Sequence, residues 1–186
     1  MLIYLKFWEG DLFIKKLYQF TRLLLGEHYD WYFKISDSPK DKNTSTGKRH
    51  EIIREKVRDL LKGISPIIYN LLKDSYIPQL RNSIAHSNYS FLGRAIHLNN
   101  DDKNSKFPQL TGISFDSWID IFHKTLVLHH QLLKMDYMIN DYYSKIYLMD
   151  NSPLPILITE KNGMQYELPI EYDKDFNRWH YLQIAD

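Results

Sequence analysis

The sequence contains no cysteine. Disulfide bonds and thiolate chemistry are therefore excluded, and a reducing compartment is favoured, so we expect a cytoplasmic protein. Long apolar runs are also lacking. Charged residues interrupt the apolar N-terminus from Lys6 onward, and no stretch approaches the ~20 residues that a membrane span needs. No small-residue cleavage site follows a basic segment, which argues against a signal peptide and leaves no predicted membrane association.

Net charge is nearly absent as well. The 24 Lys and Arg residues and 23 Asp and Glu residues leave a formal charge of +1. The field of the whole molecule therefore does not favour nucleic acid, and any RNA site must use a local basic patch. The phosphate-binding patterns G-x-x-x-x-G-K and G-x-G-x-x-G and the zinc pattern H-E-x-x-H do not occur, so the sequence predicts no nucleotide or metal site.

The 186 residues are instead rich in helical periodicity, which indicates one domain, 1–150, with an appendage. A first pattern covers residues 4–29, where Gly10 marks a possible break, and a second covers 49–64. Ser65-Pro66 is typical of a helix start, and Pro78 either kinks that helix or begins the next. Ser114 or Asp116 caps the longest helix, which ends near Leu148. Its apolar stripe consists of Trp118, Ile121, Phe122, Thr125, Leu128, Leu132, Met135, Ile139 and Tyr143.

Three segments break the helical pattern. Residues 36–48 contain no large apolar side chain and predict a flexible loop. Residues 93–113 predict a short hairpin insertion with strands at 93–98 and 110–114. In 151–186, two prolines oppose a helix, and Asn162-Gly163 is a type I′ turn signal between two short strands. This aromatic C-terminal segment is expected to pack on the helices or on a second subunit.

The stretch R-N-S-I-A-H-S-N-Y, residues 81–89, combines an arginine, an amide and a histidine on one predicted helix. A helical wheel places Leu80 and Ile84 toward the core. Asn82 and His86, four residues apart, share roughly the opposite face. Arg81 lies between the two faces, and its stem can swing toward His86. A histidine on an exposed face is most often a plain surface residue, and that alternative stays open at this stage.

Arg81, Asn82 and His86, with four residues between the arginine and the histidine, resemble the R-x4-6-H motif of the HEPN superfamily. The resemblance covers about residues 50–145 and leaves out the last forty. It implies a mainly α fold: a HEPN-like bundle of four to five helices, with the hairpin insertion and a C-terminal β-hairpin extension as additions.

The resemblance also implies a function. Many HEPN proteins are metal-independent endoribonucleases that act as toxins or antiviral-defence effectors, and none of this chemistry needs a cofactor. Arg81, Asn82 and His86 would then be the catalytic residues, while Ser87 and Tyr89 would contact the substrate. The RNA 2′-OH would attack the neighbouring phosphate, leaving a 2′,3′-cyclic phosphate and a 5′-OH. Two protomers would face each other in a homodimer, with the Asn82, His86 and Tyr89 face at or beside the interface.

Two other readings are compatible with the sequence. The chain could be a non-catalytic HEPN module for binding or dimerisation, with a nucleotidyltransferase or another defence protein as its partner. It could also be an immunity or scaffold protein in which the motif residues are surface residues without a catalytic role. A neighbouring antitoxin or nucleotidyltransferase would be the expected partner of a toxin. An evident acid to orient Ser87 or His86 is lacking, which disfavours a hydrolase triad.

Overall fold

The structure is a computed structural model that describes residues 1–37, 48–101 and 108–182. It is about 56% helical and 18% strand, with two antiparallel three-stranded sheets. The protein is therefore mixed α/β, and the prediction of a mainly α helical bundle was wrong. The physical reason is that each predicted hairpin gains a third strand. In the first sheet this strand, at 89–92, directly follows a helical pattern and resembles its continuation. In the second sheet the strand, at 178–181, lies well beyond the predicted turn. Most of the predicted 36–48 loop lies outside the described residues.

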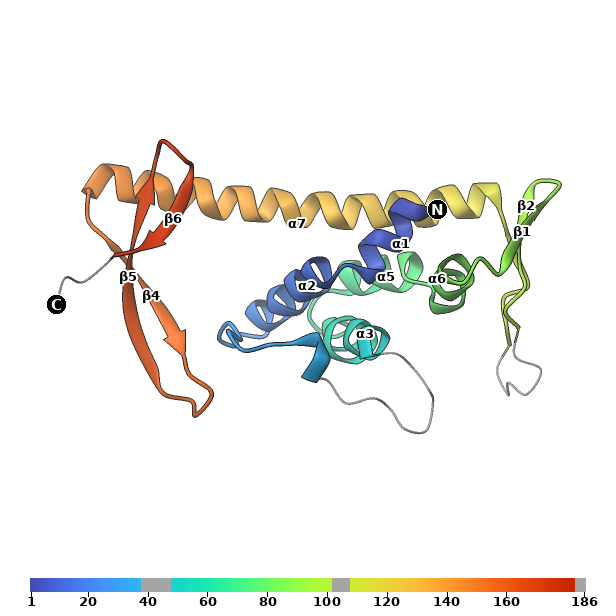
Figure 1. Ribbon diagram of the computed structural model, residues 1–186, viewed down its shortest axis with the longest axis horizontal. Helices are drawn as coiled ribbons and strands as arrows, with labels where there is room; N and C mark the ends of the chain where they lie inside the picture. The colour runs from blue at the N-terminus through green and yellow to red at the C-terminus, as the bar shows by residue number, and fades with distance from the viewer. Residues whose placement is uncertain (38–47, 102–107, 183–186) are drawn as a thin grey trace.

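One helix organises the molecule. Helix α7 (Phe115–Asp150) has 36 residues and is therefore about 54 Å long. Figure 1 shows it running along most of the molecule, with α1 (Leu2–Glu9) and α5 (Pro66–Ser75) below its first half and α2 (Asp11–Leu24) below its middle. One small sheet lies at each end of α7. Its predicted N-cap is confirmed, because Ser114 Oγ accepts from Ser117 N at 3.0 Å.

The predicted apolar stripe of α7 is buried only along its first half. Ile121, Thr125, Leu128 and Leu132 are buried against the other helices. Beyond Met135 the stripe emerges from the helical body, and its remaining members line a cavity beside the C-terminal sheet. Among the described residues, none of the helices is both long and apolar enough to cross a membrane.

Helix α1 supplies the centre of the core. The side chains of Tyr4 and Trp8 are fully buried. The break predicted at Gly10 is confirmed, since α1 ends at Glu9 and α2 begins at Asp11. A Cβ at position 10 would stand 2.8 Å from the Lys6 carbonyl oxygen. A larger residue would therefore push the two helices apart at this corner.

The helix predicted over 49–64 is a composite. The α-helical turn α3 (Lys48–Glu51) continues into a π-helical segment, η2 (Ile52–Arg58), and ends as α4 (Asp59–Leu61). A short 3₁₀ turn, η1 (Ile35–Asp37), lies before it in the chain. The side of the composite helix that faces the core is fully buried, through Ile52, Ile53, Val57 and Leu61. A seven-residue π-helix is rare and is often found at functional sites, and periodicity does not predict it.

Helices α5 and α6 (Pro78–Ala85) meet at a corner that α1 fixes. Each begins with proline at its first residue, as predicted for Pro66 and as one of the two alternatives for Pro78. Ser65 occupies the N-cap of α5, but its side chain makes no capping hydrogen bond. The Tyr4 hydroxyl donates to the Ser75 carbonyl oxygen at 3.0 Å and accepts from the Ile77 amide at 3.3 Å. This buried hydroxyl therefore joins the end of α5 to the start of α6.

The first sheet follows α6 and has the strand order β1 (Tyr89–Leu92), β2 (Ala95–Leu98), β3 (Gly112–Ser114). Strand β1 was missed because Phe91 falls on the core side of the helical wheel. The β1–β2 turn uses Gly93 at φ 58°. In the β2–β3 ladder, Ile96 lies opposite Ile113, and both are buried.

The second sheet has the order β4 (Leu154–Thr159), β5 (Gln165–Asp173), β6 (Arg178–Tyr181). The predicted β4–β5 hairpin is present, but its turn differs from type I′. Gly163 has a positive φ of 85°, whereas Asn162 is not among the residues with positive φ, and Gly163 N donates to the Glu160 carbonyl oxygen at 2.9 Å. This matches a type I turn followed by a left-handed glycine. The sheet contacts α7 where Trp179 Nε1 donates to Asn140 Oδ1 at 2.8 Å.

The Tyr4 corner predicts a specific stability effect. Tyr4→Phe keeps the ring but leaves the Ser75 carbonyl and the Ile77 amide without this partner, which should lower the free energy of unfolding by about 1–3 kcal/mol. Urea denaturation measures the loss. Tyr137→Phe is the matched control, because Tyr137 is 69% exposed. Equal stability of the two variants would contradict the role given to this hydroxyl.

Candidate functional site

The motif helix α6 ends in a tight reversal. His86 is its C-cap, and Ser87 adopts a left-handed conformation with φ 56°. Ser87 N donates to the Ile84 carbonyl oxygen at 3.3 Å and Asn88 N to the Ser83 carbonyl oxygen at 2.8 Å. These two bonds define a Schellman motif, with serine where glycine is usual. The chain therefore turns directly after His86 and enters β1 at Tyr89.

His86 and Asn82 lie on the outer side of α6, as their four-residue spacing predicts. Both side chains are exposed. Within the described part of the chain, the His86 side chain makes no hydrogen bond or ion pair. Ser87 is exposed as well, and Tyr89 is half-buried with its ring 5.7 Å from that of Phe91. The predicted residues thus form one exposed edge where α6 passes into the first sheet.

The Arg81 side chain does not swing toward His86, in contrast to the expectation from the sequence. It is only 14% exposed, and Nε lies 2.8 Å from Glu9 Oε1 at the end of α1. The Nε–H is not aligned with that oxygen, so the contact is an ion pair without a well-formed hydrogen bond. Nη1 donates to Asn82 Oδ1. The expected swing toward His86 is corrected: five residues of helix separate the two by about 140° around the axis, and Glu9 holds Arg81 on the α1 side.

A second histidine, His50, lies near Arg81 and was not among the predicted site residues. His50 Nδ1 lies 3.1 Å from the hydroxyl of the buried Tyr76. Burial, followed by the positive charges of Arg54, Arg81 and Arg58, lowers the pKa of His50 to about 4. Burial also raises the pKa of Tyr76 to about 12. His50 is therefore neutral at pH 7, in an electropositive setting made by arginines of two helices.

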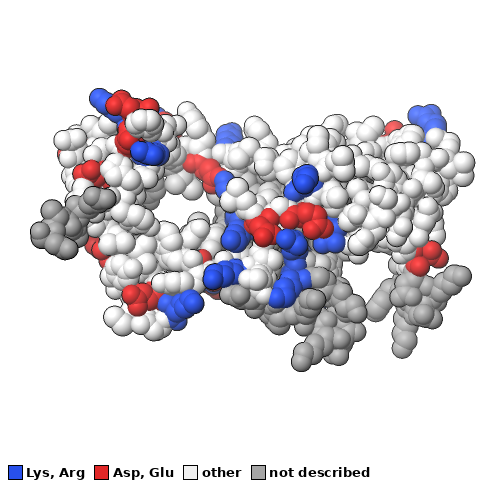
Figure 2. Space-filling view, in the orientation of Figure 1, with Lys and Arg blue, Asp and Glu red and all other residues white. Residues whose placement is uncertain are grey.

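The arginines around His50 are all close to carboxylates. Arg54 pairs with Glu55, Arg58 Nη2 lies 2.7 Å from Asp59 Oδ1, and Arg81 pairs with Glu9. Figure 2 shows basic and acidic side chains interleaved across the middle of the molecule. The spacing of His50, Arg54 and Arg58, four residues apart, was a usable signal. It was missed because the periodicity of this helix was used only to find its buried side.

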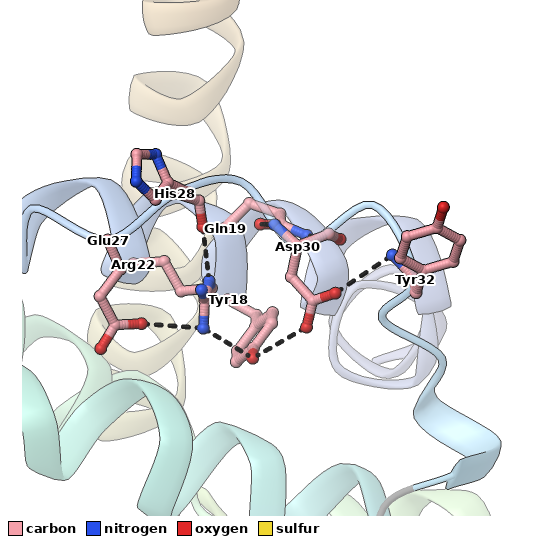
Figure 3. Close-up of polar contacts among 7 residues, drawn as sticks. All are labelled: Tyr18, Gln19, Arg22, Glu27, His28, Asp30 and Tyr32. Atoms are coloured by element: carbon pink, nitrogen blue, oxygen red, sulfur yellow. Dashed lines mark hydrogen bonds and ion pairs between the residues drawn. The ribbon is translucent and has the colours of Figure 1, made fainter. Parts of the chain in front are cut away.

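A separate polar cluster holds the segment after α2. In Figure 3, Arg22 and Asp30 are its two centres. Arg22 Nε donates to the His28 carbonyl oxygen at 2.9 Å, and its Nη1 pairs with Glu27 at 2.8 Å. Gln19 bonds twice to the Asp30 backbone, at 2.7 and 2.9 Å. The cluster supports three partly exposed aromatic side chains, those of Tyr29, Trp31 and Tyr32.

Two cavities adjoin the C-terminal sheet. One, of about 380 Å³, lies between the 28–32 segment and the β4–β5 turn, where Lys161 Nζ stands 5.4 Å from the centre of the Tyr32 ring. The other, of about 400 Å³, is mostly apolar and lies between the end of α7 and the sheet, beside Tyr143 and Trp179. Neither cavity includes a residue of the 81–89 motif. In the described ranges, no three acidic or histidine side chains gather as a metal site would require.

No family model matches the chain, no curated protein matches it, and no solved structure matches it. The likeness to the HEPN superfamily therefore rests on Arg81, Asn82 and His86, and it enters below as a proposal.

The low pKa of His50 predicts how stability depends on pH. The unfolded chain binds a proton on His50 near pH 6.5, whereas the folded chain does so near pH 4. Acidification through this window therefore lowers the free energy of unfolding, and above about pH 6.5 the ionisation of His50 costs no stability.

His50→Asn should show a smaller fall in Tm between pH 6.5 and 4.5 than the wild type. Thermal denaturation followed by circular dichroism measures it, with His180→Asn on the exposed β6 as control. Parallel Tm profiles of wild type and His50→Asn would contradict it.

Proposed function

We propose that the protein is a metal-independent endoribonuclease of HEPN type, acting as a toxin or antiviral-defence effector in the cytoplasm. The observation that carries the proposal is the position of His86. It stands exposed at the end of α6, unengaged by the described residues, one turn after Asn82 and on the helix that carries Arg81. A proton-transfer group needs such open access to its substrate, and the nearby Asn82 and Arg81 supply the amide and the cation that this chemistry uses beside it.

The chemistry follows from these groups. His86 takes the proton of the RNA 2′-OH, the 2′-oxygen forms a bond to phosphorus, and the bond from phosphorus to the 5′-oxygen breaks. A protonated histidine supplies the proton that the leaving 5′-oxygen gains. Arg81 exchanges Glu9 for the phosphate and offsets the charge that develops on its oxygens, and Asn82, already bonded to the Arg81 guanidinium, orients it. The products are a 2′,3′-cyclic phosphate and a 5′-OH.

A homodimer suits this arrangement. Within one protomer, Arg81 faces α1 and His86 faces outward, so the two groups diverge. A two-fold pairing through the Asn82, His86 and Tyr89 face brings two histidines together, one able to act as base and the other as acid. Ser87 and Tyr89, on the same edge, would contact the RNA. The proposed partners are thus an RNA substrate and a second copy, with an antitoxin or nucleotidyltransferase as the regulator.

The mechanism predicts metal-free cleavage that depends on the 2′-OH. Purified protein should cut a labelled single-stranded RNA equally well with and without EDTA, and it should leave the same RNA intact when its 2′-OH groups are methylated. Gel electrophoresis and end-group analysis for the cyclic phosphate measure both. Loss of cleavage in EDTA, or cleavage of the methylated RNA, would refute the mechanism.

The two motif residues should separate activity from stability. His86→Ala should lower the cleavage rate at least about a hundredfold and change the free energy of unfolding by less than about 0.5 kcal/mol. Arg81→Ala should lower the rate similarly, and it should also lower the free energy of unfolding by about 1–2 kcal/mol, because Glu9 loses its closest partner.

Glu9→Gln is the matched control for this pair, since it removes the same ion pair from the other side. It should reproduce the stability loss of Arg81→Ala while keeping most of the activity. Full activity of the His86→Ala variant would rule out its catalytic role.

The second candidate function is a non-catalytic binding or dimerisation module. It is favoured by the far half of α7, where Tyr137, Met138, Tyr142 and Met149 are 58–84% exposed. Apolar side chains exposed together at this level commonly mark a protein interface. This candidate predicts no cleavage of any RNA by the wild type, so the EDTA experiment also distinguishes it from the nuclease.

A further inference from the structure

A row of one neutral histidine and two arginines follows one side of the composite helix that runs from Lys48 to Leu61. His50, Arg54 and Arg58 are spaced by four residues, which places them on one side of a helix. The π-helical segment between Ile52 and Arg58 winds more loosely than an α-helix, so the four-residue spacing stays close to one turn. Arg81 of α6 lies beside this helix, since the Glu9 carboxylate is 2.8 Å from Arg81 Nε and 3.7 Å from Arg49 Nη1. Arg54, Arg58 and Arg81 all act electrostatically on His50. The row therefore continues from one helix onto the motif helix.

The row is held rigidly. The opposite side of the same helix is fully buried through Ile52, Ile53, Val57 and Leu61, so the backbone that carries the arginines is anchored in the core. The arginine side chains are themselves mostly covered, with 34% of Arg54 and 21% of Arg58 exposed. Tyr76, the C-cap of α5, bonds to His50. Such side chains lose little conformational freedom when they bind a ligand.

The charges of the row can change partners. Glu55 pairs with Arg54 and Asp59 pairs with Arg58, and these two acidic side chains are 48% and 46% exposed. Ion pairs at this level of exposure contribute little stability. A phosphate group, which arginine binds with two parallel hydrogen bonds, competes well for the same guanidinium. Arg54 and Arg58 also lie about one turn apart within the π-helical segment, so a single extended strand can contact both of them.

We infer that Arg54, Arg58 and Arg81 form a track that binds the phosphodiester backbone of single-stranded RNA and leads it to the motif helix. The inference rests on the proposed function, because RNA is the ligand. It adds a binding site to that proposal and explains how a chain of net charge +1 can hold RNA through a local patch. The track contacts phosphates and not bases, so it confers affinity without sequence preference.

The test is the binding of a short fluorescent single-stranded RNA that is fully 2′-O-methylated, measured by fluorescence anisotropy at several salt concentrations. Methylation prevents cleavage, so binding is measured alone. Arg54→Gln and Arg58→Gln should each weaken binding about five- to tenfold. Each should also lower the slope of log affinity against log salt by about 0.7, the value for one phosphate contact on a single strand.

Matched controls separate the track from general electrostatics. Arg178→Gln removes the same charge from β6, where the side chain is 65% exposed, and it should change affinity less than twofold. Asp59→Asn should tighten binding, because it removes the carboxylate that pairs with Arg58 and leaves that guanidinium available for phosphate. A purely structural role of this pair would not produce tighter binding, so this opposite sign decides the question even where an arginine variant folds poorly by circular dichroism.

The outcomes distinguish the track from the nuclease. Binding that depends on Arg54 and Arg58, without cleavage of ordinary RNA, keeps the track and overturns the endoribonuclease. Cleavage together with equal affinities of Arg54→Gln, Arg58→Gln and Arg178→Gln overturns the track alone. Absence of RNA binding by the wild type overturns the track as well.

Discussion

The Tyr4 hydroxyl lies at the corner between α5 and α6 and bonds to the backbone on both sides of it. Trp8, one turn further along α1, donates from its indole to Thr125 Oγ1 in α7 at 3.3 Å. Both side chains are fully buried, so both polar groups depend on these partners. Helix α1 thus ties the α5–α6 corner to the longest helix. The direction of α6, and the place of Glu9 opposite Arg81, follow from this attachment.

Local signals in the sequence located several helix boundaries. Gly10, Pro66, Pro78 and Ser114 each mark a boundary that the structure also has, because the physical causes act within a few residues. Strands β1 and β6 were not predicted, since a strand becomes stable through a partner elsewhere in the chain. The same limit applies to the turn at Asn162-Gly163, where the residue types suit more than one turn and the ladder selects between them.

The candidate site was predictable in part for the same reason. The outward placement of Asn82 and His86 depends on the spacing within one helix and could be derived from the sequence. The position of Arg81 depends on Glu9, which is distant in sequence and belongs to another helix. The cluster of Arg81 with His50, Tyr76 and the arginines of η2 required the packing of two helices to be known. Charge pairing between helices therefore decides which cations face each other, and periodicity within one helix cannot show it.

The length of α7 also fixes a rotational phase between the two ends of the protein. The second sheet is attached to the far end of this helix through Trp179 and Asn140, and it meets the helical body again where Lys161 lies over Tyr32. Inserting one residue in the middle of α7 would turn the sheet by about 100° around the helix axis and move it by about 1.5 Å. The second contact would then be lost, although every local interaction of the sheet would be intact. The orientation of the second sheet around the helix axis is therefore kept only by insertions and deletions that add or remove close to whole turns of α7.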